Sequence, residues 1–245
     1  MGALSQVMFK SEAKIMKIIP VITGLAAILI AGLSGCSSIE KNYSGAKPVD
    51  YSLLDASAQR KLVEGELRVI GDALKEYKKD HEGQLPPDLT TLVLDKYLDS
   101  RDIVSSADSS CGKEGGVPDQ YKTWGQANEA DEPASSYLYE FSAKVCSWDW
   151  NAYLAGKPSS DKLDINRDGV VSWAEVKNWQ MSHGDTVQQP KGNYPKAAFP
   201  VVRCYWYNYP DAYTPEADAK SVLNLAVDLK TVFISQPWWE KDFSR

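Results

Sequence analysis

The clearest pattern in the sequence is a stripe of apolar residues with helical spacing. Leu67, Ile70, Leu74 and Tyr77 recur at intervals of three and four residues, which places them on one face of an α-helix. Lysines crowd the last turns, where they complement the helix dipole, and Gly83 follows as a stop signal. We therefore predict one long helix from about residue 53 to residue 83. Its polar faces carry Glu66, Lys75, Lys78 and Lys79.

Apolar runs later in the chain predict strands. The first run covers residues 136–141, after a polar stretch that we interpret as a loop, and the second covers residues 199–207. Two further runs at 221–227 and 231–235 flank a short turn and predict a hairpin. Because the helix comes first and the strands follow without a βαβ order, the pattern favours an α+β fold. In this fold an antiparallel sheet packs on one long helix.

The first 35 residues have the pattern of an export signal. Three lysines precede an apolar run over residues 18–33, which is 16 residues long. A membrane-spanning helix needs about 20 apolar residues, so the run fits the core of a signal peptide better. The run ends in Leu33-Ser34-Gly35-Cys36, and the start of translation can be Met1 or Met16.

This ending resembles the lipobox of bacterial lipoproteins. The resemblance implies that residues 1–35 are removed and that Cys36 becomes the lipidated first residue, with residues 36–52 as its tether. It also implies a cell-envelope location, and Ser37 in place of aspartate favours the outer membrane. The alternative is a plain secretory signal, which would leave the exported protein without a lipid.

Composition and charge narrow the choice of partners. The chain has 27 basic and 33 acidic residues, a net charge of −6, which argues against a nucleic-acid partner. Loss of residues 1–35 makes the net charge −8, so an anionic membrane would repel the protein and only the lipid would hold it there. The chain has two histidines, and no motif for a nucleophile or a phosphate loop appears, so we do not expect an enzyme.

Export would place the remaining cysteines in an oxidising compartment. Cys111, Cys146 and Cys204 are odd in number, which predicts one disulfide and one buried thiol. The sequence leaves all three pairings open.

The sharpest motif runs from Asp164 to Glu175. Oxygen-bearing side chains alternate at its start, and Gly169 permits the backbone reversal that would turn a carbonyl oxygen toward an ion. Calcium prefers six to eight oxygen ligands, and Glu175 can supply two of them. The predicted Ca²⁺ ligands, with Ser172 acting through a water, are Asp164, Asn166, Asp168, Val170, Ser172 and Glu175.

The same stretch resembles the calcium loops of EF-hand proteins and of dockerin modules. As in dockerins, a regular entering helix is not expected, because glycine and proline precede the loop. The resemblance implies weak Ca²⁺ binding that clips an insertion at about residues 147–190. The alternative is an acidic turn that binds no metal.

A further resemblance concerns the helix end. Residues 73–89 are similar to the end of the long helix in type II secretion pseudopilins, and residues 200–204 and 222–225 are similar to the closing strands of pilin-like proteins. The similarity implies a pilin-like domain at 53–245 with a structural or accessory role in an envelope or secretion assembly. The cleavage region of that family is absent from this sequence. The alternative is a carbohydrate-binding lipoprotein that uses exposed aromatics such as Trp124, Trp148, Trp150, Trp206, Trp238 and Trp239.

Overall fold

A computed structural model of the chain describes residues 50–117, 135–186, 192–207 and 222–240. The predicted signal segment, Cys36 and Trp124 lie outside these ranges. Within the described part of the chain, no helix is both long and apolar enough to cross a membrane.

The predicted long helix is confirmed as α1, which spans Ala56–Asp80 and has 25 residues. It begins at Ala56 because the side chain of Asp55 accepts the Ala58 amide at 2.8 Å and caps the first turn. The chain before it forms a short 3₁₀ turn, η1, at Tyr51–Leu53. After α1 ends, Gly83 takes a positive φ of 85°, the left-handed conformation that glycine tolerates best.

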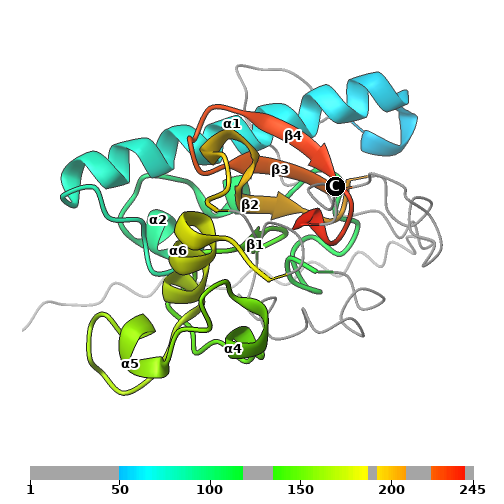
Figure 1. The fold of residues 1–245 in the computed structure, drawn as a ribbon. Coiled ribbons are helices and arrows are strands. Elements are labelled where there is room, and N and C mark those ends of the chain that lie inside the picture. Colours follow the sequence, from blue (N-terminus) through cyan, green and yellow to red (C-terminus); the bar gives the residue numbers. More distant parts are fainter. Residues whose placement is uncertain (1–49, 118–134, 187–191, 208–221, 241–245) are drawn as a thin grey trace, which may run out of the picture. The chain divides into compact units, whose positions relative to one another are not determined.

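The predicted sheet is also confirmed as antiparallel. It has four strands in the order β1-β2-β3-β4: β1 at Leu138–Tyr139, β2 at Pro200–Cys204, β3 at Val222–Ala226 and β4 at Val232–Ser235. The run at 136–141 was expected to be a full strand, but only two of its residues pair. The fold is therefore α+β, with α1 lying along the sheet (Figure 1).

One face of the sheet packs against α1. Leu67, Ile70 and Leu74 are fully buried in the main core together with Leu225 of β3. The helix comes so close to the sheet that a Cβ built on Gly71 would lie 3.2 Å from the Leu225 side chain. Alternating side chains of a strand point to opposite faces, so Asn224 faces away from α1.

The opposite face of the sheet carries charge. Arg203 of β2 has no exposed surface and donates to the Asn224 side chain at 2.9 Å. Helix α6, at Trp173–His183, reaches this side through Lys177, which meets Glu140 just after β1, and the carbonyl of Pro237 accepts a hydrogen bond from Arg203. Such buried charge is not expected from the apolar runs that predicted the strands.

Short helical segments connect these elements. They are α2 at Leu89–Leu94, η2 at Ser100–Ile103, α4 at Trp150–Tyr153, α5 at Ser160–Leu163 and η4 at Lys196–Ala198. The residues from 154 to 176 have a small apolar cluster of their own, built on Leu154, Leu163, Val171 and Val176. Helix α6 also reaches the main core, because Ala174 and Met181 pack against it.

Glu66 differs from its prediction. It was expected on the polar side of α1, but only 8% of it is exposed. Its carboxylate accepts hydrogen bonds from Ser105, Ser106 and Tyr137, so it ties the loop after η2 and the start of β1 to the helix. Burial of a carboxylate is tolerated because each bond offsets part of its desolvation cost.

Candidate functional site

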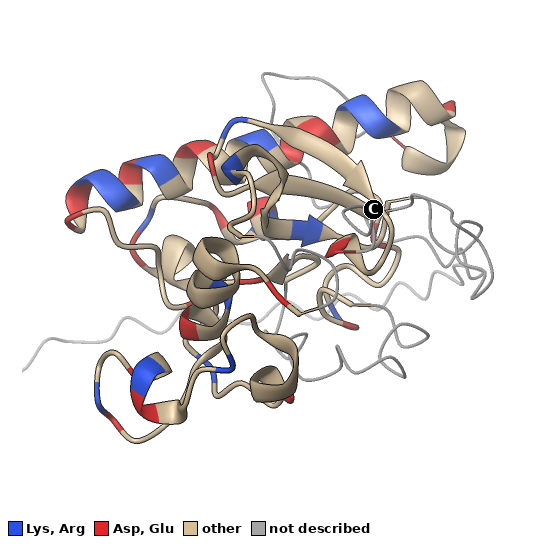
Figure 2. Cartoon of the chain, in the orientation of Figure 1, with Lys and Arg blue, Asp and Glu red and all other residues tan. Residues whose placement is uncertain are grey.

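The predicted calcium loop lies between α5 and α6. Only one four-residue turn of helix, α5, precedes it, in line with the expectation of no regular entering helix, and the loop ends inside the first turn of α6. Asp164 and Ser172 are half-buried, Asn166, Asp168 and Val170 are exposed, and Glu175 is buried. The charged residues of this loop stand out in Figure 2.

Asp164 organises the first half of the loop. Its Oδ1 accepts the Asp168 amide at 3.1 Å, and its Oδ2 accepts the Gly169 amide at 2.9 Å. Asn166 Oδ1 accepts the Asp168 amide at 3.1 Å, while its Nδ2 donates to Asp168 Oδ2 at 2.9 Å. Gly169 has φ of 88°, so the reversal occurs at the predicted residue.

Glu175 joins the two ends of the loop. Its Oε1 accepts the Ile165 amide at 2.8 Å, and its Oε2 accepts the Ser172 amide at 2.9 Å. Ser172 Oγ in turn accepts the Glu175 amide, which completes a capping box at the start of α6. One buried side chain therefore fixes the start of the loop, its end and the start of the helix.

The oxygens of the loop face backbone amides. Among the residues that the structure describes, no group of three or more His, Cys, Asp or Glu side chains is arranged to hold a metal ion. Carboxylates that accept hydrogen bonds keep further lone pairs, so the same oxygens have capacity for an added cation. Bidentate binding by Glu175 would require it to turn away from Ser172.

A second group of charges was not predicted. We call Glu140, Lys177, Arg203 and Glu240 the buried charge cluster. Lys177 Nζ lies 2.8 Å from Glu140 Oε2 and 3.9 Å from Glu240 Oε1, and Arg203 Nη1 lies 3.3 Å from Glu140 Oε1. All four side chains are 7% exposed or less. The cluster joins α6 to the end of β1, to β2 and to the C-terminal segment.

Aromatic rings enclose the lysine of this cluster. Lys177 Nζ lies 5.3 Å from the ring centre of Trp148, 5.8 Å from that of Trp173 and 5.9 Å from that of Trp239. Such cation–π contacts strengthen when water is excluded. Burial raises the pKa of Glu240, an effect that the positive charge of Lys177 opposes and the negative charge of Glu140 reinforces. No local sequence signal identifies the cluster, since its members come from four separate segments.

The cysteines depart from the prediction in part. Cys146 and Cys204 are thiols, and every pairing among Cys111, Cys146 and Cys204 needs one of them. The structure therefore contains no disulfide among these three residues. Cys204 is a buried thiol near Ser105, and burial raises its pKa to about 12 even though the Ser105 hydroxyl lowers it. The thiol is therefore protonated at neutral pH.

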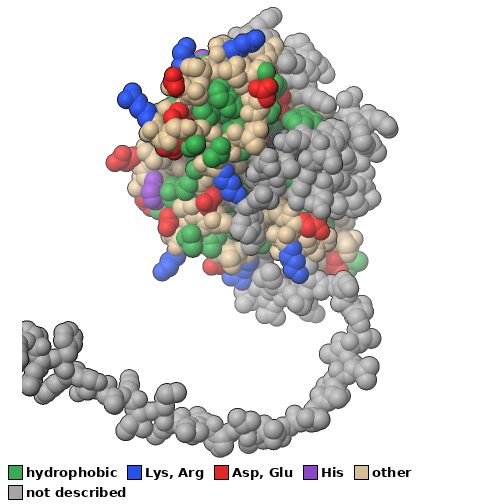
Figure 3. Space-filling model, turned by 90° about the horizontal axis from the view of Figure 1, so that it is seen from below, with side chains coloured by type: hydrophobic (Ala, Val, Ile, Leu, Met, Phe, Trp, Pro, Cys, Tyr) green, Lys and Arg blue, Asp and Glu red, His purple; other side chains and the backbone are tan. Residues whose placement is uncertain are grey.

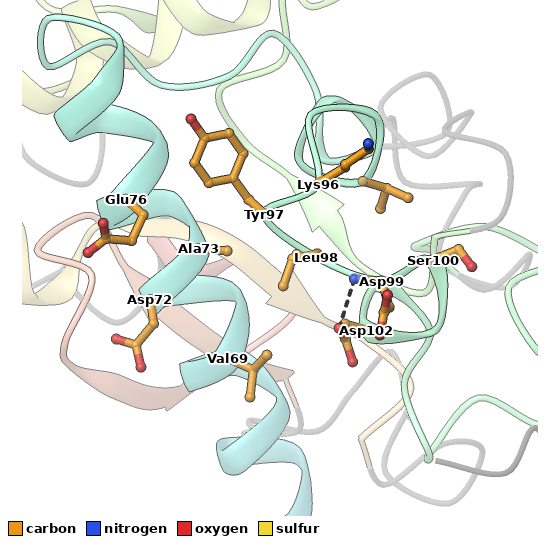
Figure 4. Close-up of a pocket in the computed structure, with 11 residues that line it drawn as sticks. Val69, Asp72, Ala73, Glu76, Lys96, Tyr97, Leu98, Asp99, Ser100 and Asp102 are labelled. Carbon is orange, nitrogen blue, oxygen red and sulfur yellow. Dashed lines mark hydrogen bonds between the residues drawn. The ribbon is translucent and has the colours of Figure 1, made fainter. Parts of the chain in front are cut away.

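A groove with a volume of about 780 Å³ lies between α1 and the segment after α2 (Figure 4). Two of its acidic side chains have a cationic neighbour: Asp72 lies 2.7 Å from Lys75, and Asp99 lies 3.1 Å from Arg101. Acidic, basic and apolar side chains are also interspersed on the face seen in Figure 3. Asp102, in the same lining, instead accepts the Asp99 amide at 3.0 Å.

Comparisons with known proteins give no relative for this chain. No protein-family profile, no curated protein and no solved structure matches it.

Proposed function

We propose that the chain is an exported, lipid-anchored protein whose 164–175 loop binds Ca²⁺. Its role is structural or accessory, in an envelope or secretion assembly, and it is not an enzyme. The single observation that carries the calcium proposal is the position of Glu175. This one carboxylate contacts residue 165 through one oxygen and residue 172 through the other, so the two ends of the loop already meet at the group that would close the ion's shell.

The hydrogen bonds of the loop also set the expected affinity. Asp164 can keep its bonds to two amides and still offer lone pairs, because each oxygen accepts only one bond there. Glu175 must exchange its bonds from Ser172 for the ion. Calcium binding therefore competes with the capping box, and we expect a dissociation constant of about 10⁻⁴–10⁻³ M, as in extracellular modules.

Calorimetric titration of the soluble fragment 37–245 with Ca²⁺ tests this proposal. We expect saturable binding to the wild type and a loss of at least about tenfold in affinity for Glu175→Gln, since the amide removes a charge and one anionic oxygen. Asp161→Asn is the matched control, because Asp161 is an exposed acid just before the loop. No saturable heat at millimolar Ca²⁺, or equal binding by Glu175→Gln, would leave the loop as an acidic turn.

The lipid anchor rests on the resemblance at Cys36 and needs its own test. Labelling of cells with a radioactive fatty acid should mark the wild type and the Cys146→Ser variant. Cys36→Ser should remain unlabelled and unprocessed, because lipid transfer needs that thiol. An unlabelled wild-type protein that fractionates as a soluble species would contradict the anchor.

The assembly role is supported by the combination of one long helix and an antiparallel sheet, which agrees with the pilin-like expectation at the level of fold class. The carbohydrate-binding alternative requires a row of exposed tryptophans, whereas the described tryptophans are buried or half-buried. Chemical cross-linking in the native envelope distinguishes the assembly role from carbohydrate binding. We expect protein partners that cross-link reproducibly, and retention on a glycan surface without such partners would favour the alternative.

A further inference from the structure

The buried charge cluster holds an amine against a carboxyl group. Lys177 Nζ and Glu140 Oε2 are 2.8 Å apart, and the two side chains are only 5% and 1% exposed. The ammonium and the carboxylate thus form a close ion pair that is removed from water.

The surroundings of this pair exclude water. Three tryptophan rings lie within 6 Å of the amine, at 5.3, 5.8 and 5.9 Å. Removal of an ammonium and a carboxylate from water costs several kcal/mol for each ion. A neutral product made from the two groups would avoid this cost, and the same exclusion of water would protect that product from hydrolysis.

We propose that Lys177 and Glu140 condense to an intramolecular amide bond that joins helix α6 covalently to the end of strand β1. A proton first passes from the ammonium to the carboxylate, which gives a neutral amine and a carboxylic acid. The Nζ lone pair then attacks Cδ of Glu140. The new N–Cδ bond forms, the Cδ–Oε2 bond breaks, and Oε2 leaves with two protons as one molecule of water. No oxidant, metal or cofactor is required.

Two neighbours of the pair, Arg203 and Glu240, lie where they can assist the condensation. Arg203 Nη1 lies 3.3 Å from Glu140 Oε1, the oxygen that would carry negative charge in the tetrahedral intermediate. Glu240 Oε1 lies 3.9 Å from the amine and can move a proton from Nζ to the leaving oxygen. Its pKa is raised by burial, which makes its carboxyl a better proton carrier at neutral pH.

Proximity and charge both permit the step. Groups held in contact react with effective concentrations of about 10⁵–10⁸ M relative to free partners. The cluster holds two cations and two anions before the step, and Arg203 with Glu240 remains afterwards, so it stays neutral. The bond does not depend on calcium, because Glu175 takes no part in it.

Peptide mapping of the purified full-length protein tests the proposal. Trypsin cannot cut after an acylated lysine, so residues 123–144 should appear joined to residues 168–191, with a mass one water below the sum of the two peptides. Lys177→Arg keeps the charge but has no amine nucleophile, and it should give separate peptides. Glu240→Gln should form the joined species about a hundredfold more slowly.

Two control variants complete the peptide-mapping experiment. Lys162→Arg alters an exposed lysine on α5 and should leave the joined peptide unchanged. Glu175→Gln should also retain it, so loss of calcium binding and loss of the amide bond can be told apart. If wild-type protein is cut after Lys177 and yields residues 123–144, 168–177 and 178–191 as separate peptides at full mass, the proposal is wrong.

Discussion

Helices α1 and α6 pack on the rest of the fold by opposite means. The stripe of α1 places fully buried Leu67, Ile70 and Leu74 against β3 and β4. Apart from Glu66, the charged residues of α1, coloured in Figure 2, are exposed or half-buried. Helix α6 instead buries Lys177, which meets Glu140 beneath it. Apolar contact can be read from spacing along one segment, whereas a buried ion pair depends on partners from elsewhere. The contrast teaches that the surroundings of the two helices should respond differently to mutation and to pH.

The largest effect is expected where α6 meets the buried charge cluster. Lys177→Met removes both the cation and the amine of the proposed bond, and it leaves Glu140 and Glu240 with only Arg203 to balance them. Breaking a buried ion pair in this way typically costs about 3–5 kcal/mol, and loss of the amide bond would add to that cost. Urea unfolding of the wild type and the variant measures the difference. Lys162→Met, at an exposed position of α5, should change the free energy of unfolding by less than about 0.5 kcal/mol. Equal stability of Lys177→Met and the wild type would remove the cluster from this account.

A smaller effect is expected at the turn between β3 and β4, which lies beside α1. Asp228 accepts the amides of Lys230 and Thr231, both at 2.9 Å. Asp228→Ala should cost about 1–2 kcal/mol at pH 7, because two amides lose a charged acceptor. Asp228→Asn is the matched control and should lose less, since an amide oxygen still accepts.

The same residue gives a pH dependence with a definite sign. Burial alone would raise the pKa of Asp228, but hydrogen bonds from Thr231 and Lys230 outweigh it and hold the pKa below its ordinary value of 3.8. Its contribution is therefore present above about pH 4 and is lost as the pH falls through the lower folded-state value. Unfolding measured from pH 7 to pH 3 should show the gap between the wild type and Asp228→Ala closing at the acid end.

The smallest expected effect is the difference in stability between alanine substitutions at two glycines of α1. A Cβ on Gly71 would lie 3.2 Å from Leu225 Cδ2 and 3.3 Å from the Leu229 carbonyl oxygen, whereas nothing lies within 4 Å of a Cβ on Gly65. Gly65→Ala should stabilise the protein by about 0.5–1 kcal/mol through helix propensity. Gly71→Ala should destabilise it by about 1 kcal/mol because overpacking outweighs that gain. Thermal unfolding of the pair decides whether α1 approaches the sheet this closely.

Prediction from sequence succeeded where the signal is local. The stripe from Leu67 to Tyr77, the stop at Gly83 and the β3–β4 hairpin all come from patterns within one segment, and each is present. The capping box of Ser172 and Glu175 is likewise local and is present. In these cases the residues that interact are close in the chain, so spacing alone identifies them.

The sequence patterns did not predict the buried polar groups, and the reason is physical. Glu66 carries the same charge as an exposed helix residue, but its burial depends on hydroxyl groups of Ser105 and Tyr137, far along the chain. Lys177 likewise gives no local sign that Glu140, Trp148 and Trp239 lie around it. Partners that meet only in the folded chain leave no spacing signal, so a buried polar group is the kind of feature that sequence patterns miss.

The central claim is that the 164–175 loop binds calcium through Glu175, and thermal unfolding with and without Ca²⁺ tests it most directly. A ligand bound only by the native state stabilises it by RT ln(1 + [L]/Kd), which is about 2.7 kcal/mol at a hundred times Kd. We predict that saturating Ca²⁺ raises the Tm of the fragment 37–245 by several degrees and that of Glu175→Gln hardly at all. Equal Tm values with calcium and with a chelator, or an equal rise in both proteins, would contradict it.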